Sequence, residues 1–311
     1  MHAFLPEQSH FNQVHLRVAD LERALVFYSE ALGLNVLDGP GVQASLSAST
    51  ERPELILLSE DRNALPRPPG TTGLYHIALR YSSREGLARA FERVARTGWP
   101  IAGASDHGVS EAIYLSDPDG NGVELYADRP RARWRWRDGQ VAMTTQALNL
   151  EDLLATNSDE TATAAKPPQI DIGHIHLQVP DLAPAERFYS GFLGFSVTQR
   201  SLPGALFFAA GLYHHHIAVN VWAGPAAPAS RGVGLVSYRL QVPCAEILYC
   251  LSHRGPLFGY ETQSAAAGHG APLLRIRDPN GAWLEIQASP AAAASRQATQ
   301  TGAGHVAIAR S

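Results

Sequence analysis

The sequence has few cysteines, no long apolar run and no large excess of one charge, and each shortage excludes a class of protein. Cys244 and Cys250 are the only cysteines among 311 residues, too few for a disulfide framework or a zinc ribbon. Any metal site must therefore use histidine and carboxylate ligands. The formal net charge of −4 provides no basic field for nucleic acid, so we expect no nucleic-acid partner.

No apolar stretch is long enough to span a membrane, and the first residues lack the apolar core of a signal peptide. We therefore expect a soluble, cytoplasmic protein without a membrane partner. Hydrophobic residues make up 45% of the chain, which suits globular cores. The length is sufficient for two domains of ordinary size.

The chain contains an internal repeat with one constant offset. HLRVADLERALVFYSEALGL at 15–34 returns as HLQVPDLAPAERFYSGFLGF at 176–195, and DPDGNGVEL at 117–125 returns as DPNGAWLEI at 278–286. Both pairs are 161 residues apart. A constant offset predicts two homologous halves with little net insertion between them.

We place the two halves at 1–130 and 170–290, each as a domain. Residues 131–169 are expected to form a linker with a short helix that begins after Asn149. The segment 291–311 has little to bury and is expected to be a disordered tail.

Each half also contains two copies of a shorter pattern of strands and a helix. In the first half, a strand at 13–18 precedes a helix that Asp20 caps, and a strand at 76–81 precedes a helix that Ser83 caps. Short β-rich runs fill the rest of each quarter. The sequence therefore predicts an α+β fold of four modules, each with a strand, a helix and about three strands.

One acid lies inside an otherwise apolar hairpin. The run AIYLS enters a turn at 117–120, and Val123–Tyr126 leaves it. Glu124 is costly to bury in this strand unless a cation pairs with it, and a metal ion is an obvious partner. The alternative is a surface strand with Glu124 in water.

Four blocks together resemble a known superfamily: GLYHIAL at 73–79, SEAIYLSDPDGNGVELYADRP at 110–130, GHIHLQVPDL at 173–182 and YHHHIAVNVWAG at 213–224. Tandem βαβββ modules with these motifs resemble the vicinal oxygen chelate superfamily of glyoxalase I, bleomycin resistance proteins and extradiol dioxygenases. Within it, the blocks are most similar to two-domain catechol 2,3-dioxygenases. The resemblance covers about 1–290 and implies four βαβββ modules that form two paired-module half-barrels.

The resemblance implies metal ligands near the start of the first strand and near the end of the last strand of a module. Counted back from the helix caps, the first-strand positions of the four modules are Gln13, His76, His174 and Ser237. The last-strand positions are Glu54, Glu124, His215 and Glu285. In the third module this strand is expected over 214–219, with His215 facing away from its two histidine neighbours.

A site drawn from two modules depends on which modules pair. Pairing the first two would give a glutamine, a histidine and two glutamates, the ligand formula of glyoxalase I with nickel or zinc. Pairing the second and third gives His76, Glu124 and His174, the 2-His-1-carboxylate triad of non-haem Fe(II) oxygenases. We favour this pairing, which predicts that the central modules assemble across the linker. The outer modules would then form a non-catalytic barrel.

As an extradiol dioxygenase, the protein would open an aromatic ortho-diol with O₂ on Fe(II), with Mn(II) as the alternative metal. The resemblance implies that His215 acts as acid and base and that Tyr114 donates to a substrate oxygen. His107 resembles a further family histidine that lies behind the ligands and supports the catalytic site. His176 is the rival of His174, because both lie on one face of the same predicted strand. We also expect a homo-oligomer.

Other interpretations stay open at this point. A strand histidine is often a core or surface residue, Tyr114 could be a packed strand aromatic, and the three consecutive histidines at 214–216 could be a solvated edge strand. Asn220 and Trp222 are expected to line the pocket. A metal-free binding protein similar to the bleomycin resistance proteins is a further alternative, which metal analysis would distinguish.

Overall fold

The computed structural model describes residues 5–39, 41–50, 53–156, 169–225, 227–230, 232–266 and 271–289. Within these residues, each quarter of the repeat has the predicted order of one strand, one helix and three strands. The α+β class and the modular architecture are therefore confirmed. The tail at 291–311 and the linker residues 157–168 lie outside the described residues.

The first half contains two modules. The elements of the first module are β1 (His10–Val18), α1 (Leu21–Val26), β2 (Asn35–Asp38), β3 (Gln43–Ser47) and β4 (Ile56–Glu60). Those of the second module are β5 (Gly73–Tyr81), α2 (Arg84–Thr97), β6 (Ile101–Asp106), β7 (Ser110–Ser116) and β8 (Gly122–Asp128).

The second half repeats this order. The elements of the third module are β12 (Ile170–Gln178), α4 (Leu182–Glu186), β13 (Ser196–Gln199), β14 (Ala205–Ala209) and β15 (Ile217–Asn220). Those of the fourth module are β16 (Gly234–Val242), α5 (Ala245–Phe258), β17 (Thr262–Ala266), β18 (Pro272–Arg277) and β19 (Trp283–Ala288).

The helix caps are those that the sequence predicts. Asp20 accepts a hydrogen bond from the backbone N–H of Arg23, and Ser83 accepts one from Gly86. The α2 helix ends at Gly98, which adopts the left-handed conformation at φ 69°. The sequence did not predict the π-helical turn that continues α1 over Phe27–Ala31, nor the one that continues α4 over Arg187–Phe192.

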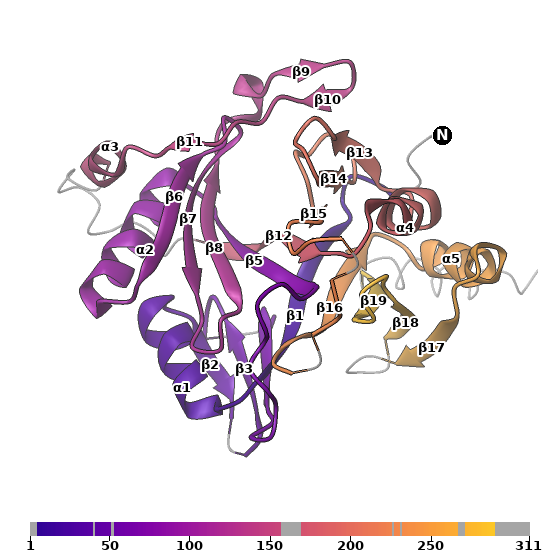
Figure 1. The fold of residues 1–311 in the computed structure, drawn as a ribbon, viewed down its shortest axis with the longest axis horizontal. Coiled ribbons are helices and arrows are strands. Elements are labelled where there is room, and N and C mark those ends of the chain that lie inside the picture. Colours follow the sequence, from indigo (N-terminus) through magenta and orange to yellow (C-terminus); the bar gives the residue numbers. More distant parts are fainter. Residues whose placement is uncertain are drawn as a thin grey trace, which may run out of the picture.

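The modules pair across the two halves of the chain (Figure 1). One sheet has the order β11-β6-β7-β8-β5-β12-β15-β14-β13 and joins the second and third modules. The other has the order β17-β18-β19-β16-β1-β4-β3-β2 and joins the fourth and first modules. The predicted assembly of the central modules is thus confirmed.

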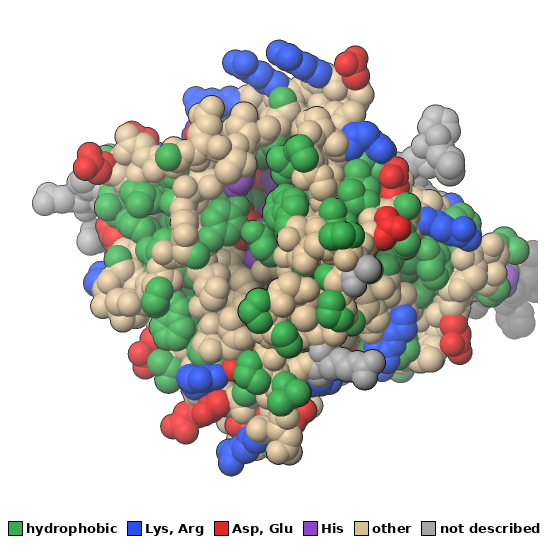
Figure 2. Space-filling view, in the orientation of Figure 1, with side chains coloured by type: hydrophobic (Ala, Val, Ile, Leu, Met, Phe, Trp, Pro, Cys, Tyr) green, Lys and Arg blue, Asp and Glu red, His purple; other side chains and the backbone are tan. Residues whose placement is uncertain are grey.

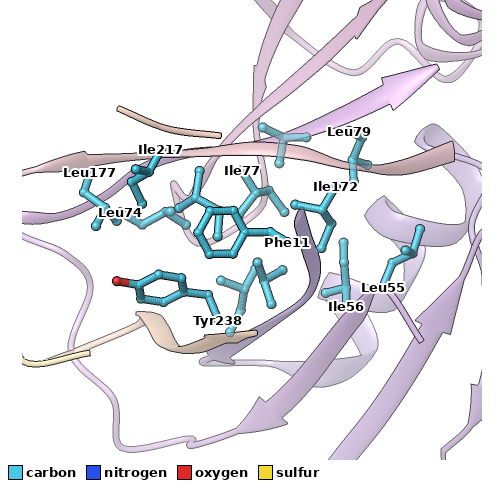
Figure 3. Close-up of a cluster of buried hydrophobic side chains, with 14 of the residues drawn as sticks. Phe11, Leu55, Ile56, Leu74, Ile77, Leu79, Ile172, Leu177, Ile217 and Tyr238 are labelled. Carbon is cyan, nitrogen blue, oxygen red and sulfur yellow. The ribbon is translucent and has the colours of Figure 1, made fainter. Parts of the chain in front are cut away.

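The two sheets pack against each other through apolar side chains. Phe11 and Tyr238 from the outer modules meet Leu74, Ile77 and Leu177 from the central modules (Figure 3). All five are at most 2% exposed. Burial of each such side chain contributes on the order of 2 kcal/mol, so this shared core joins the two halves of the chain.

A tyrosine after each short helix also links the sheets. Tyr28 of the first module donates to Asp117 in the turn of the second module, at 3.1 Å. At the repeat position, the hydroxyls of Tyr189 and Tyr238 donate to Asp278. The DPxG turns are therefore anchored from inside, because each aspartate accepts from a buried phenol.

Much of the segment between the halves lies within the described residues. Asn149 caps α3 (Leu150–Ala155), the short helix that the sequence predicts, and β11 (Gln146–Ala147) extends the edge of the central sheet. A small hairpin consists of β9 (Trp136–Arg137) and β10 (Gln140–Val141). Among the helices that the structure describes, none combines the length and the apolar character needed to cross a bilayer.

Candidate metal centre

The strand register brings three potential ligands around one small residue, Ala78. In the antiparallel pair β5–β12, His174 lies opposite Ala78, and in the parallel pair β5–β8, Glu124 lies opposite Ala78 from the other side. His76 is two residues before Ala78 on β5 and therefore shares its face. Because Ala78 has only a methyl side chain, space is left between the side chains of the three potential ligands.

The three ligand atoms form a tight triangle. Nε2 of His76 and Nε2 of His174 each lie 3.0 Å from Oε2 of Glu124, and the two nitrogens are 3.3 Å apart. Two atoms that bind one ion at right angles, each about 2.1 Å away, are about 3.0 Å apart. The triangle and the donor set therefore fit a divalent transition-metal ion.

Burial sets the protonation states that a metal requires. Burial lowers the pKa of His174 to about 4 although Glu124 is adjacent. Burial alone would raise the pKa of Glu124, but the two histidines outweigh this effect and hold it well below its usual range. At neutral pH the imidazole of His174 is therefore neutral and the carboxylate of Glu124 is ionised, and these are the forms that bind metals.

The three consecutive histidines precede a strand and do not lie in it. The strand expected over 214–219 begins only at Ile217, so the predicted opposition of His215 to its neighbours is wrong. Nδ1 of His214 and Nδ1 of His215 are 2.8 Å apart. All three histidines are buried, which excludes the solvated edge strand. The ring of His215 contacts that of His174 at a tilt of 51°, with centroids 4.1 Å apart.

The group that holds His214 could not be found from any sequence motif. Its Nε2 lies 2.9 Å from Oδ1 of Asp128, the last residue of β8, which also accepts from the hydroxyl of Tyr213. Burial would raise the pKa of Asp128, but the bond from His214 and the charge of Arg80 lower it below its usual value. An ionised Asp128 can only accept, so Nε2 of His214 carries a proton.

Close packing holds the hydrogen-bonded group of His214, Asp128 and Tyr213 beside the potential ligands. The hydroxyl of Tyr126 lies 2.8 Å from that of Tyr213. A Cβ atom at residue 173 would lie 1.7 Å from the Tyr126 hydroxyl. β5 lies between β8 and β12, so the Tyr126 side chain reaches from β8 across β5, and only a glycine at position 173 leaves room for it directly before His174.

Tyr114 and His107 lie together at the rim of the triad. Tyr114 is paired with Glu124 across β7 and β8, and its ring centroid is 5.7 Å from that of His76. Its hydroxyl lies 2.7 Å from Nε2 of His107, whose Nδ1 lies 2.8 Å from the carbonyl of Thr144. Burial, with Glu124 nearby, raises the pKa of Tyr114 well above 10, so the phenol keeps its proton.

His176, the rival ligand, is held by a different partner. Its Nε2 lies 2.9 Å from Nδ2 of Asn220, and its ring contacts those of Tyr75 and Trp222. The cluster of possible metal ligands found within the described residues contains His174 and not His176. Histidine surfaces are visible at the base of a hollow framed by hydrophobic side chains (Figure 2).

The outer sheet contains the positions that repeat this centre, but a side chain fills the space in which a metal would lie. Arg239 stands 161 residues after Ala78, opposite both Gln13 and Glu285. Arg239 and Arg275 both donate to Glu285, at 2.8 Å and 2.6 Å. A guanidinium thus neutralises the buried carboxylate, as a metal would in the central sheet. Gln13 on β1 donates to Glu54, which precedes β4, at 3.4 Å. His76 and Glu124 lie in the other sheet, so the four ligands expected for glyoxalase I are not assembled.

We therefore predict that Glu285→Ala leaves metal binding intact while it lowers stability. The free energy of unfolding should fall by about 1–3 kcal/mol, because two arginines lose a buried partner but can partly turn to water. Urea unfolding and metal analysis of the purified variant would test this. A loss of metal equal to that of Glu124→Ala would contradict the division of roles between the two sheets.

A pH dependence is expected from His216, whose Nδ1 accepts from the backbone N–H of Ala210 at 3.2 Å. Burial lowers its pKa to about 3, so the unfolded chain binds the proton first on acidification. The contribution of His216 to stability should fall by about 1.4 kcal/mol per pH unit between about pH 6 and pH 3. His216→Asn keeps the acceptor without the titration, so its unfolding free energy should depend less on pH. Parallel pH dependences of both proteins would contradict this prediction.

Comparison with known proteins gives three findings. The Glyoxalase/Bleomycin resistance protein/Dioxygenase superfamily profile matches residues 10–125. A catechol-2,3-dioxygenase of Bacillus subtilis (strain 168) is 41% identical over 284 residues, covering 89% of this chain and 97% of the relative. A lactoylglutathione lyase of Escherichia coli O157:H7 is 28% identical over 127 residues, covering 38% of this chain and 92% of the relative.

The fold is also found among solved structures. Glyoxalase I from Zea mays superposes with a TM-score of 0.58 over 96% of this chain and 98% of that chain, at 15% identity. This likeness concerns the architecture alone, since the sequences have diverged widely.

Proposed function

Because this chain belongs to the Glyoxalase/Bleomycin resistance protein/Dioxygenase superfamily, we propose that it is an extradiol dioxygenase that uses Fe(II) and O₂ to open a catechol-type ring. Mn(II) is the alternative metal. The observation that carries the proposal is the buried His76–Glu124–His174 triangle. Two histidines and one carboxylate on one side of an ion leave its other positions open for substrate. The 41% identity with a catechol-2,3-dioxygenase supports the same reaction.

When bound, the metal would supply the Lewis acidity that lowers the pKa of the diol hydroxyls and the redox chemistry with O₂. In the overall reaction both oxygen atoms enter the product, and the ring bond beside the diol breaks. His76, Glu124 and His174 would hold the ion. The aromatic side chains around the hollow would exclude water from the ring.

His215 would move the proton of the substrate. Since Nε2 of His214 donates to Asp128, Nδ1 of a neutral His214 has a lone pair and accepts from Nδ1–H of His215. Nε2 of His215 is then the nitrogen with the free lone pair and can accept a proton from a hydroxyl. Burial and the neighbouring histidines hold the pKa of His215 well below its usual value, so the imidazole is neutral before reaction.

Tyr114 would orient the substrate as a neutral donor. Its phenol remains protonated and lies beside His107, which can accept from the hydroxyl or donate to it. A protonated phenol at the edge of the triad suits a hydrogen bond to a developing negative charge on oxygen. Tyr114 and His107 would thus act as a pair.

Anaerobic reconstitution with Fe(II), followed by catechol and air, tests the proposal. The expected result is the yellow ring-opened semialdehyde, formed only in protein that contains iron. No colour with catechol and its methyl derivatives, together with tightly bound nickel or zinc, would contradict it.

A further inference from the structure

A cavity of about 290 Å³ lies between the two sheets. Residues at the ends of β1, β5, β12 and β16 and the turn from Arg277 to Trp283 form its walls. Two of the lining residues, Leu74 and Leu177, belong to the core between the sheets (Figure 3). The three candidate metal ligands do not line this cavity, which is therefore a separate site.

The charges around the cavity are unbalanced. Arg17, Arg67 and Arg277 line it, and Asp278 is the one acid among the described lining residues. Both oxygens of Asp278 are committed to protein donors. Oδ1 accepts from the backbone N–H groups of residues 280 and 282, and Oδ2 accepts from two tyrosine hydroxyls. The carboxylate is therefore not available to the three arginines.

Arg67 is a half-buried cation that the structure surrounds with neutral acceptors. Its guanidinium donates to the carbonyls of Thr71 and Leu74 and to Oε1 of Gln178. Among the described residues, no carboxylate lies within ion-pair distance of it. Burial lowers the pKa of the Arg67 guanidinium, because a cation removed from water is disfavoured.

The other two arginines retain donors that no described residue accepts. Within the described residues, Arg17 makes one long hydrogen bond, 3.4 Å, to the carbonyl of Gly232. Arg277 donates to Gly281 and lies over the ring of Trp283, 3.6 Å from its centroid. The hydroxyl of Ser230, also in the wall, is buried and has no partner among the described residues. Guanidinium groups in this state bind carboxylate and phosphate oxygens strongly.

We propose that this cavity binds a small anion that carries a carboxylate or a phosphate group. Its size matches the lower range of small-molecule sites, and an anion there would neutralise the buried charge of Arg67 and use the free donors of Arg17. The site spans both sheets, so a bound anion would hold the central and outer module pairs together.

Isothermal titration of the metal-loaded full chain with inorganic phosphate, and separately with succinate, tests the proposal at constant ionic strength set with chloride. We expect saturable binding of at least one of the two, and the preferred anion identifies the group. Arg17→Gln should weaken binding roughly tenfold, because a hydrogen bond to a charged group is lost. Arg67→Gln should abolish it, if the variant folds.

Arg62→Gln is the matched control. It removes the same charge from an arginine whose side chain is 82% exposed and paired with Glu60, so anion binding should not change. Binding of neither anion above the chloride background would overturn the proposal. An equal affinity in wild type and Arg17→Gln would also overturn it.

Discussion

Glu124→Ala and His174→Ala should each lose the metal, whereas His176→Ala should retain it. The ligand atoms of Glu124 and His174 lie 3.0 Å apart beside His76, but His176 is bonded to Asn220. Substitutions that only support a ligand cost about 10–100-fold in metal affinity. Removal of a ligand should therefore cost more than about 100-fold. Competition with a chromogenic chelator, at matched protein concentration, measures this affinity.

The His176→Ala variant is the matched control for His174→Ala. Both are buried histidines on β12, two residues apart, so general damage to the strand would affect both variants. Equal loss of metal in the two variants would show that the triad is incorrectly assigned. Loss in His176→Ala alone would transfer the ligand role to the rival.

His215→Asn should lower the rate of ring cleavage by about 10²–10⁴-fold while the iron content stays at the wild-type level. The physical reason is that His215 contacts a ligand ring yet is not one of the triangle atoms. Removing it should therefore take away the proton acceptor but not the metal. Oxygen uptake in iron-loaded protein, together with iron analysis, measures both quantities. A parallel loss of iron and activity would contradict an acid–base role.

Asp128→Asn should give a smaller loss, on the order of tenfold, with an altered pH profile of the rate. An asparagine can present its N–H₂ group to Nε2 of His214, which reverses the hydrogen bonds along the His214–His215 pair. Asp171→Asn is the control, because Asp171 also pairs with Arg80 but, within the described part of the chain, makes no hydrogen bond to His214. Its rate and pH profile should match those of the wild type.

The repeat in the sequence predicted most of the fold. The offset of 161 residues and the caps Asp20 and Ser83 defined the modules, because caps and turn residues act locally. The pairing of the central modules followed from chemistry alone: only that pairing collected His76, Glu124 and His174. The π-helical turns could not be predicted, since their Phe-Tyr-Ser segments have an ordinary helical pattern.

The sequence predicted which three candidate ligands lie together, but not the residues that surround them. The strand alternation applied to His215 was wrong because β15 begins at Ile217, and boundaries are the weakest part of a periodicity argument. Asp128 has no motif of its own; it matters only because folding places it at 2.9 Å from His214. The exchange of Ala78 for Arg239 at the constant offset was visible in the sequence. An arginine at this position predicts that the repeated site in the outer sheet binds no metal.

Anomalous diffraction at the iron edge, from crystals of the full chain grown anaerobically with Fe(II), tests the central proposal most directly. We predict one iron peak, about 2.0–2.2 Å from the ligand atoms of His76, Glu124 and His174, and none beside Glu285. A peak in the outer sheet, or coordination by His176 in place of His174, would contradict the proposed centre. So would a fully ordered triangle with no metal at saturating Fe(II).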